Sequence, residues 1–247
     1  MTAVAWVSGT PVDSSDVDGR EEALRAGPVA PTLPRERTGE GRQLRRWLVQ
    51  VLVAERLVAE EARGLPPGPP LAEIAPDRAA LLGLGSVAAD LLTRDPLARA
   101  VFAAVTADVR VSAEAVGRCY DPARYRVPEE RVVRHAIGGG PPRRRVLRRG
   151  ELTGPVEDAV FAAEAGDTVG PVRDPLGTHT LVLEEVRPAR VRPLDEVRES
   201  ITAWLTAAAR RRAFTAWLDE RMAARVRLAP GYEHPGDPDQ PDNTHRH

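Results

Sequence analysis

The hydrophobic pattern of this chain changes twice along its length, and this change is the strongest constraint on the fold. Apolar residues recur at three- and four-residue steps across residues 42–63 and again from about 194 to 226, which predicts two long amphipathic helices. Between them, at about 128–188, β-branched residues gather in short runs such as 131–137 and 177–186, as they do in strands. The pattern predicts a small strand-rich unit inserted between helices that pack together.

Shorter elements are marked by capping residues and by proline. A short helix is predicted at 111–120 because Ser112 is a good N-cap and Glu114 follows in the first turn. The remaining predicted elements are a short strand, a Ser-Gly turn and a helix start within 4–18, a loop at 27–41, two helices within 76–108 interrupted at Pro96, a weak strand at 143–152, a short helix at 155–165, and a turn into extended chain at 166–172.

Charge and cysteine content exclude several classes of protein. The 35 basic residues, all of them arginine, are balanced by 36 acidic ones, so the formal net charge is −1 and gives no bulk attraction to nucleic acid or anionic membrane. The one cysteine, Cys119, can form no disulfide within the chain and no Cys-based zinc site. Residues 1–11 hold no basic segment followed by a long apolar run, and no stretch approaches a transmembrane length. We therefore expect a cytoplasmic protein.

Four stretches, in order, resemble the SurA/PrsA/PpiD group of parvulin-type prolyl isomerase chaperones and the related NifM maturation factors. They are VAWVSGTPVDSSDVD (4–18), LRRWLVQVLVAERLVAEEARGL (44–65), VSAEAVGRCYDPARYRVPEERVVRHAI (111–137) and GELTGPVEDAVFAAEAGDTVGPVRDPLGTHTLVLEEV (150–186). The resemblance implies an α+β fold: a helical chaperone-like module from residues 1–127 plus 189–230, an inserted parvulin-like small antiparallel sheet unit at 128–188, and a polar tail at 231–247.

The parvulin-like part is shorter than the family pattern. His135 is followed almost at once by Gly138, Gly139 and Gly140, so the helical segment that usually follows the first strand is missing. The Asp or Cys that family members carry near the substrate carbonyl is missing with it. The aromatic residue of the family's proline pocket aligns with Val156.

The resemblance assigns a candidate site to this unit. His135 and His179 are implied to be catalytic, as paired histidines on neighbouring strands, because two neutral imidazoles can bond each other. Leu152, Val156 and Phe161 are implied to line the substrate pocket. Two alternatives stay open: the histidines are a buried polar pair that joins two strands, and the three apolar residues are ordinary core.

Arginine and tryptophan residues suggest further binding surfaces. The run RRRVLRR (143–149) has arginines on both faces if it is a strand. Arg144 and Arg148 are then candidates for binding an acidic peptide or partner, and the alternative is a solvated edge strand protected from aggregation. The run lacks interleaved aromatic residues, which disfavours nucleic acid. Three residues of the amphipathic helices are candidates for a client groove or for core: Trp47, Trp204 and Trp217.

The C-terminal residues carry a candidate metal site. His234 is separated by three aspartates from His245 and His247, and His-x-His on extended chain suits Cu or Zn. The alternative is a polar tail without metal. Rotation about an X–Pro bond itself needs no metal or nucleophile, so we otherwise expect no cofactor.

Taken with the resemblance, these features predict a cytoplasmic folding or maturation factor that binds a client protein or precursor peptide, with weak or no isomerase activity. An active prolyl isomerase is one alternative. A repurposed scaffold with a His-based metal or small-molecule site is another. We expect no nucleic-acid or membrane partner, and a homodimer formed by helix exchange stays open.

Overall fold

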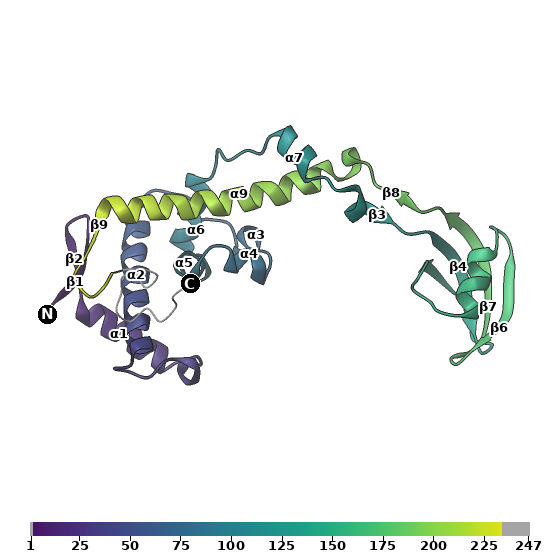
Figure 1. The fold of residues 1–247 in the computed structure, drawn as a ribbon, viewed down its shortest axis with the longest axis horizontal. Coiled ribbons are helices and arrows are strands. Elements are labelled where there is room, and N and C mark those ends of the chain that lie inside the picture. Colours follow the sequence, from purple (N-terminus) through teal and green to yellow (C-terminus); the bar gives the residue numbers. More distant parts are fainter. Residues whose placement is uncertain (1, 234–247) are drawn as a thin grey trace. The chain divides into compact units, whose positions relative to one another are not determined.

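The computed structural model describes residues 2–233 and divides them into two compact units. Residues 2–111 with 203–233 form the first, which we call the helical unit, and Ser112–Thr202 form the second, which we call the sheet unit (Figure 1). Each unit has its own buried apolar cluster or clusters. The predicted α+β class is confirmed.

The helical unit begins with a β-hairpin and is built mainly of helices. Its elements are β1 (Ala3–Val7), β2 (Thr10–Asp13), α1 (Ser14–Arg25), η1 (Ala30–Thr32), α2 (Gly39–Glu61), α3 (Leu71–Ile74), α4 (Arg78–Leu82), α5 (Ser86–Arg94), α6 (Pro96–Val105), most of α9 (Leu194–Arg225) and β9 (Val226–Leu228). The first two strands and the last form one antiparallel sheet in the order β2-β1-β9. Side-chain caps fix several helix starts, since the side chains of Thr38, Asp77 and Asp95 accept from the amides of Gly41, Ala80 and Leu97.

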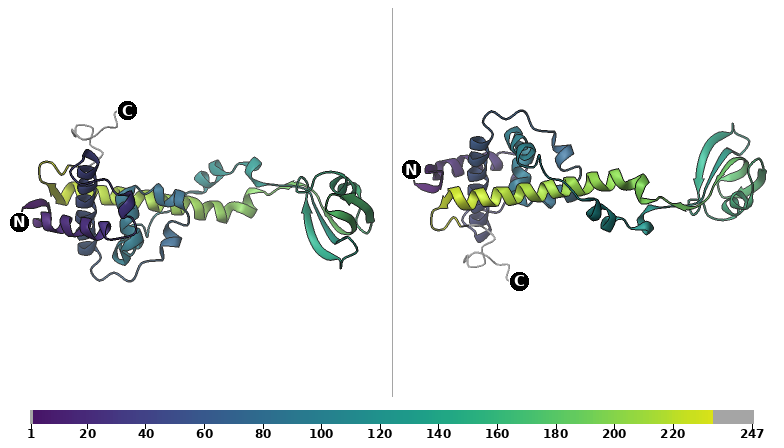
Figure 2. Two further views of the ribbon diagram at one scale, coloured as in Figure 1. Left: turned by 90° about the horizontal axis from the view of Figure 1, so that it is seen from below. Right: turned by 90° about the horizontal axis from the view of Figure 1, so that it is seen from above.

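The C-terminal helix completes the core of the helical unit. Phe214 and Leu218 of α9 are buried in one cluster with Ala54 and Val58 of α2, and the two helices cross in the views of Figures 1 and 2. Arg211 also donates to the carbonyl of Ile74 at 2.9 Å. The prediction that helices from both ends of the chain pack together is confirmed.

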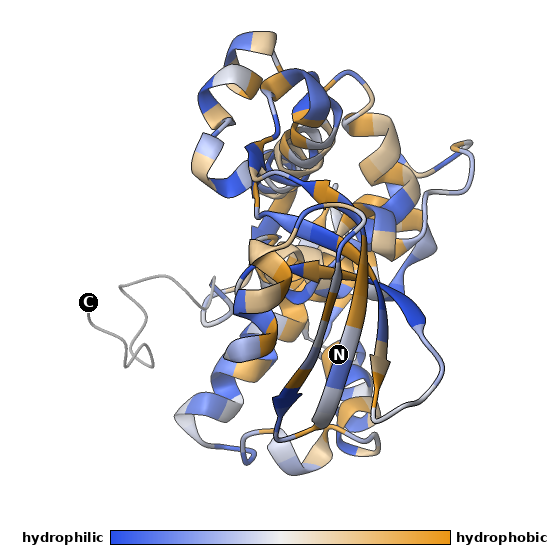
Figure 3. Cartoon of the chain, turned by 90° about the vertical axis from the view of Figure 1, so that its right-hand side faces the viewer, coloured by the Kyte–Doolittle hydropathy of each residue, from blue (hydrophilic) through white to orange (hydrophobic). Residues whose placement is uncertain are grey.

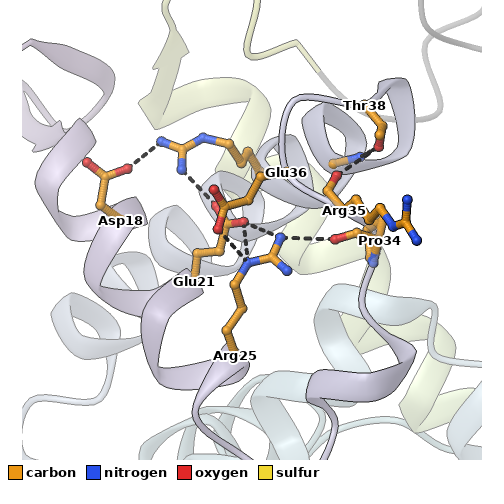
Figure 4. A network of polar contacts seen from close by, with 9 residues as sticks. Asp18, Glu21, Arg25, Pro34, Arg35, Glu36 and Thr38 are labelled. Carbon is orange, nitrogen blue, oxygen red and sulfur yellow. Dashed lines mark hydrogen bonds and ion pairs between the residues drawn. The ribbon is translucent and has the colours of Figure 1, made fainter.

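A buried carboxylate joins α1 to α2 (Figure 4). The side chain of Glu21 is 8% exposed and accepts from Arg25 at 2.6 Å and from Arg45 at 2.7 Å. Arg45 also binds Asp18 at 2.6 Å. Burial acts to raise the pKa of Glu21, but the hydrogen bonds and charges of the two arginines outweigh it and hold that pKa below its ordinary value. Glu21 therefore stays ionised and fixes α1 against α2.

The sheet unit carries a four-stranded antiparallel sheet in the order β5-β4-β7-β6. Its elements are α7 (Ala113–Cys119), η2 (Pro122–Tyr125), β3 (Arg126–Val127), β4 (Glu130–Ile137), β5 (Arg143–Arg148), α8 (Pro155–Ala162), β6 (Thr168–Asp174), β7 (Gly177–Arg187), β8 (Arg190–Val191) and the start of α9. The strands alternate hydrophobic and hydrophilic residues (Figure 3), and helix α8 packs on one face. That face holds the core, with Val133, Leu147, Val160, Leu181 and Leu183 among its buried members.

The structure differs from the sequence-based prediction in several places. The contacts divide the chain at 111/112 and 202/203 rather than at 128 and 188. The strand pair β3–β8 and the hydrogen bond from the Tyr120 hydroxyl to the carbonyl of Arg192 (2.8 Å) join the two connecting segments of the sheet unit to each other. Residues 76–108 form three helices, and 166–172 is mostly strand β6. Strands β2 and β9 were not predicted, because short strands depend on pairing partners from elsewhere in the chain.

Among residues 2–233, no helix combines the length and the apolar character that a membrane span requires.

Candidate functional site

The two histidines predicted to be paired lie on adjacent central strands. His135 is on β4 and His179 on β7, and Nε2 of His135 lies 2.8 Å from Nδ1 of His179. The rings are stacked with centroids 5.0 Å apart, and the residues are 5% and 3% exposed. The pairing itself is confirmed, while a catalytic role stays a prediction.

A third residue extends the pair. Nε2 of His179 lies 2.7 Å from Oδ1 of Asp174, the last residue of β6. Burial acts to raise the pKa of Asp174, but the hydrogen bonds from His179 and from the amides of Leu176 and Gly177 hold it below its ordinary value. The carboxylate therefore accepts from Nε2–H of His179. The contact between Nε2 of His135 and Nδ1 of His179 is one hydrogen bond, in which one nitrogen donates and the other accepts.

His135 is held in its neutral form. Its Nδ1 is buried and has no hydrogen-bond partner among the described residues. Burial lowers the pKa of His135 below its ordinary value of 6.5, and the neighbouring His179 and Arg145 lower it further, against the opposite effect of Asp174. The site is therefore a hydrogen-bonded relay, Asp174–His179–His135, near one end of the sheet, with an ionised carboxylate at one end and a neutral His135 at the other.

This neutral state makes the stability of the sheet unit depend on pH. Below 6.5, the ordinary pKa of histidine, an unfolded His135 binds a proton that the folded one does not. The free energy of unfolding of the sheet unit should therefore fall as the pH decreases through 6.5. In His135→Gln this dependence should disappear between about pH 7.5 and about pH 5.5, where carboxylates stay ionised. Hydrogen exchange of β4 and β7 amides at both pH values measures it, and an unchanged slope in the variant would contradict a neutral His135.

The three residues predicted to line the pocket lie mainly in the core of the sheet unit. Val156 and Phe161 on α8 are 2% and 7% exposed and pack with the buried face of the sheet. Leu152 is partly buried against the same cluster. The ring of Phe161 is also covered by guanidinium groups, with Arg131 at 5.0 Å and Arg149 at 4.5 Å from its centroid. These positions agree with the alternative interpretation that the three residues are core.

The two arginines predicted to bind substrate are ion-paired on the other face of the sheet. Arg144 binds Glu184 at 2.9 Å and Arg148 binds Glu130 at 3.1 Å. Arg148 and Arg144 alternate along β5 with Leu147, which is buried on the α8 side. The prediction that the run has arginines on both faces is confirmed. Arg144 and Arg148 themselves point away from the histidine pair.

Sequence reasoning missed Asp174 and two apolar residues near the pair. Ile137 is the cross-strand partner of His179 and is 39% exposed, and Leu176, in the β6–β7 turn, is 78% exposed. The segment Asp174–Gly177 is a turn signal, with Asp, Pro and Gly at its bends. Read as a hairpin, it would have predicted β6 and placed Asp174 beside His179.

The helical unit contains a cavity of about 670 Å³. It lies between the start of α5, the end of α9 and β9, and its lining includes Ser86, Leu218, Met222 and Leu228. None of the three tryptophans predicted for a client groove lines it. Trp47 and Trp217 pack partly buried against the two cores of the unit. Trp204 is 61% exposed, so the interpretation of it as core is wrong.

The predicted metal ligands His234, His245 and His247 lie outside the described residues, so the Cu or Zn site stays a prediction. Within 2–233, no cluster of three or more His, Cys, Asp or Glu side chains is arranged to hold a metal ion.

Comparison with known proteins identifies two segments. Residues 137–199 match the family model of the PPIC-type PPIASE domain, and residues 3–40 match a family of unknown function, DUF7158. No curated protein matches the chain. The PPIC-type segment contains His179 and Asp174, and His135 lies two residues before it.

The solved structures that align with this chain include SurA-like chaperones. Two, from work on the virulence factor PEB4 and the periplasmic protein Cj1289 of Campylobacter jejuni, align at 15% and 10% identity with TM-scores of 0.41 and 0.43. These alignments cover 90% and 93% of this chain and 98% and 100% of those chains. The peptidylprolyl isomerase PrsA of Bacillus cereus aligns at 13% identity and a TM-score of 0.25, covering 95% of this chain and 96% of that one.

The sheet unit thus contains a segment that matches the PPIC-type rotamase family, residues 137–199, and pairs His179 of that segment with His135. The predicted parvulin-type resemblance is confirmed over this segment. In this unit β4 and β5 are joined directly by residues 138–142.

Proposed function

We propose that this protein is a folding or maturation factor that binds proline-containing segments of a client polypeptide over the relay in its sheet unit. The observation that carries the proposal is the 2.8 Å contact between His135 and His179, the second of which lies inside the segment that matches the PPIC-type family. The partly exposed Ile137 next to His179 offers an apolar contact for a proline ring. The cavity of the helical unit offers a second surface for the same client.

The chemistry of such a site needs only differential binding. An X–Pro bond rotates slowly because its amide has partial double-bond character, with a barrier of about 18–20 kcal/mol. No bond breaks, so a protein accelerates rotation when it binds the twisted amide more tightly than the planar one. The relay supports this role, because it places hydrogen-bonded polar groups beside the partly exposed Ile137.

We propose that isomerase activity is weak. The chain connects β4 to β5 through 138–142, where the family pattern has a helical segment that contributes a residue near the substrate carbonyl. Val156, at the position of the family's pocket aromatic, is 2% exposed and packed in the core. Peptide binding is therefore the main activity, with slow turnover as a consequence of it. The client's identity, a cytoplasmic location and a homodimer stay predictions.

The test compares peptide binding and isomerisation in matched variants. Wild-type protein should bind an acetylated Ala-Xaa-Pro-Phe peptide more tightly than the same peptide with Ala for Pro, and should accelerate its cis–trans exchange measurably in exchange NMR spectroscopy. His179→Ala removes both hydrogen bonds of the relay, so both quantities should fall about tenfold.

Thr180→Ala is the matched control. Thr180 is the next residue of β7, is exposed and points to the other face, so this variant should behave as wild type. A wild-type protein that binds no proline peptide and leaves its exchange rate unchanged would contradict the proposed function.

A further inference from the structure

The arginines on the two faces of edge strand β5 differ in whether they form ion pairs. Arg143 and Arg145 pair across the ladder with His135 and Val133, so all four side chains lie on the same face. Leu147, two residues further along, is 1% exposed in the core on that face. One face of β5 thus presents two arginines beside the relay, and the other presents Arg144 and Arg148.

The face of the sheet opposite α8, which we call the outer face, carries arginines that are neutralised within the protein. Arg144 binds Glu184, and Arg148 binds Glu130, which also lies 3.5 Å from Arg187. Arg149, just past the end of β5, binds Glu129 at 2.7 Å, and the same carboxylate lies 2.6 Å from Arg131. The carboxylates of Glu129, Glu130 and Glu184 are therefore already engaged.

Arg143 and Arg145 have no such partner. Both are exposed, and neither makes an ion pair or a side-chain hydrogen bond within residues 2–233. Arg145 is close enough to His135 for its charge to act on that imidazole. Two guanidinium groups with free donors therefore stand at the edge of the relay, and a carboxylate is the group that such donors bind in a bidentate way.

The geometry points to Arg143 and Arg145 as specificity residues that select peptides with an acidic side chain adjacent to the proline. This inference rests on the proposed function and names the substrate class of the same site. A proline over Ile137 and His179 would place its neighbouring residue about 3.4 Å along the peptide. That residue would then be within reach of an arginine on β5, the strand next to β4. Because both arginines are exposed, their contribution should weaken as salt rises.

The experiment uses acetylated Ala-Xaa-Pro-Phe and Ala-Ala-Pro-Xaa peptides with Glu, Gln or Lys at Xaa. We expect wild-type protein to bind the Glu peptide of at least one series about threefold to tenfold more tightly than its Gln counterpart at low salt. The Lys peptide should bind more weakly than the Gln peptide. The double variant Arg143→Gln, Arg145→Gln should bind Glu and Gln peptides equally.

A second double variant controls for net charge. Arg134 and Arg173 are exposed, make no ion pair within the described residues, and lie on the opposite face of the sheet. The variant Arg134→Gln, Arg173→Gln removes the same charge and should keep the preference for Glu. Hydrogen exchange verifies that both double variants remain folded, and all four substitutions are of exposed side chains.

The outcomes separate the inference from the proposed function. Loss of the Glu preference in the Arg143, Arg145 variant alone supports the inference. Proline-dependent binding without any preference for Glu, or a preference that survives in that variant, overturns it and leaves the proposed function intact. Absence of binding to every peptide overturns both.

Discussion

Phe214→Ala is expected to lower the free energy of unfolding of the helical unit by about 3–5 kcal/mol. Phe214 is 0% exposed on α9 and belongs to a cluster that also contains residues of α2, α5 and α6. Its ring centroid lies 5.5 Å from that of Phe102 and 5.7 Å from that of Trp217. Removal of the ring leaves a cavity at the point where the C-terminal helix meets the N-terminal ones, and well-packed helices cannot collapse to fill it.

The measurement is hydrogen exchange resolved by unit, with denaturant unfolding beside it. Trp204→Ala is the matched control, since Trp204 is an aromatic residue of the same helix but is 61% exposed. The control should change stability by no more than about 0.5 kcal/mol. If Phe214→Ala cost less than about 1 kcal/mol, α9 would not be a necessary part of the helical core.

The second large effect is expected in the sheet unit. Leu181→Ala should lower its free energy of unfolding by about 2–5 kcal/mol. Leu181 is 0% exposed on the central strand β7, pairs with His135, and packs in the cluster beneath α8. Its loss therefore removes a core contact directly beside the relay, so peptide binding should weaken along with stability.

The neighbouring residue on the same strand provides the control. Val182 is 39% exposed and points to the other face of the sheet, so Val182→Ala should have a small effect. Protection from exchange in Leu181→Ala should fall in β4, β6 and β7 and stay unchanged in α2 and α5, because the two units have separate cores. Equal loss in both units would contradict two independent cores.

On the face of the sheet opposite α8, arginine side chains lie around one buried apolar residue. Val132 lies beneath this face and is 0% exposed, although its neighbours Val146 and Val182 are each 39% exposed. The long side chains of Arg144 and Arg148, held by Glu184 and Glu130, lie on the same face. Arginine stems can cover apolar surface while their charged ends stay in water. Ion-paired arginines thus help to complete this small sheet.

The local elements of the protein could be predicted from its sequence. The cap at Ser112 and the break at Pro96 mark helix ends in the sequence and in the structure alike. The β-branched runs at 131–137 and 177–186 predicted β4 and β7, and the resemblance placed His135 and His179 next to each other on them. The helix ends and the strands depend on residues close together in the chain. The pairing of the two histidines was predicted from an ordered set of motifs.

Tertiary structure decided the features that depend on partners far apart in the chain. The sequence offered several arginines in 143–149, but register and the positions of Glu130 and Glu184 determine that Arg144 and Arg148 are paired while Arg143 and Arg145 are not. The exposure of Trp204 likewise depends on which face of α9 meets the rest of the unit. Non-local contacts determine which strands pair, which arginines form ion pairs and which side chains are buried. The hydrophobic period of the sequence alone does not predict these features.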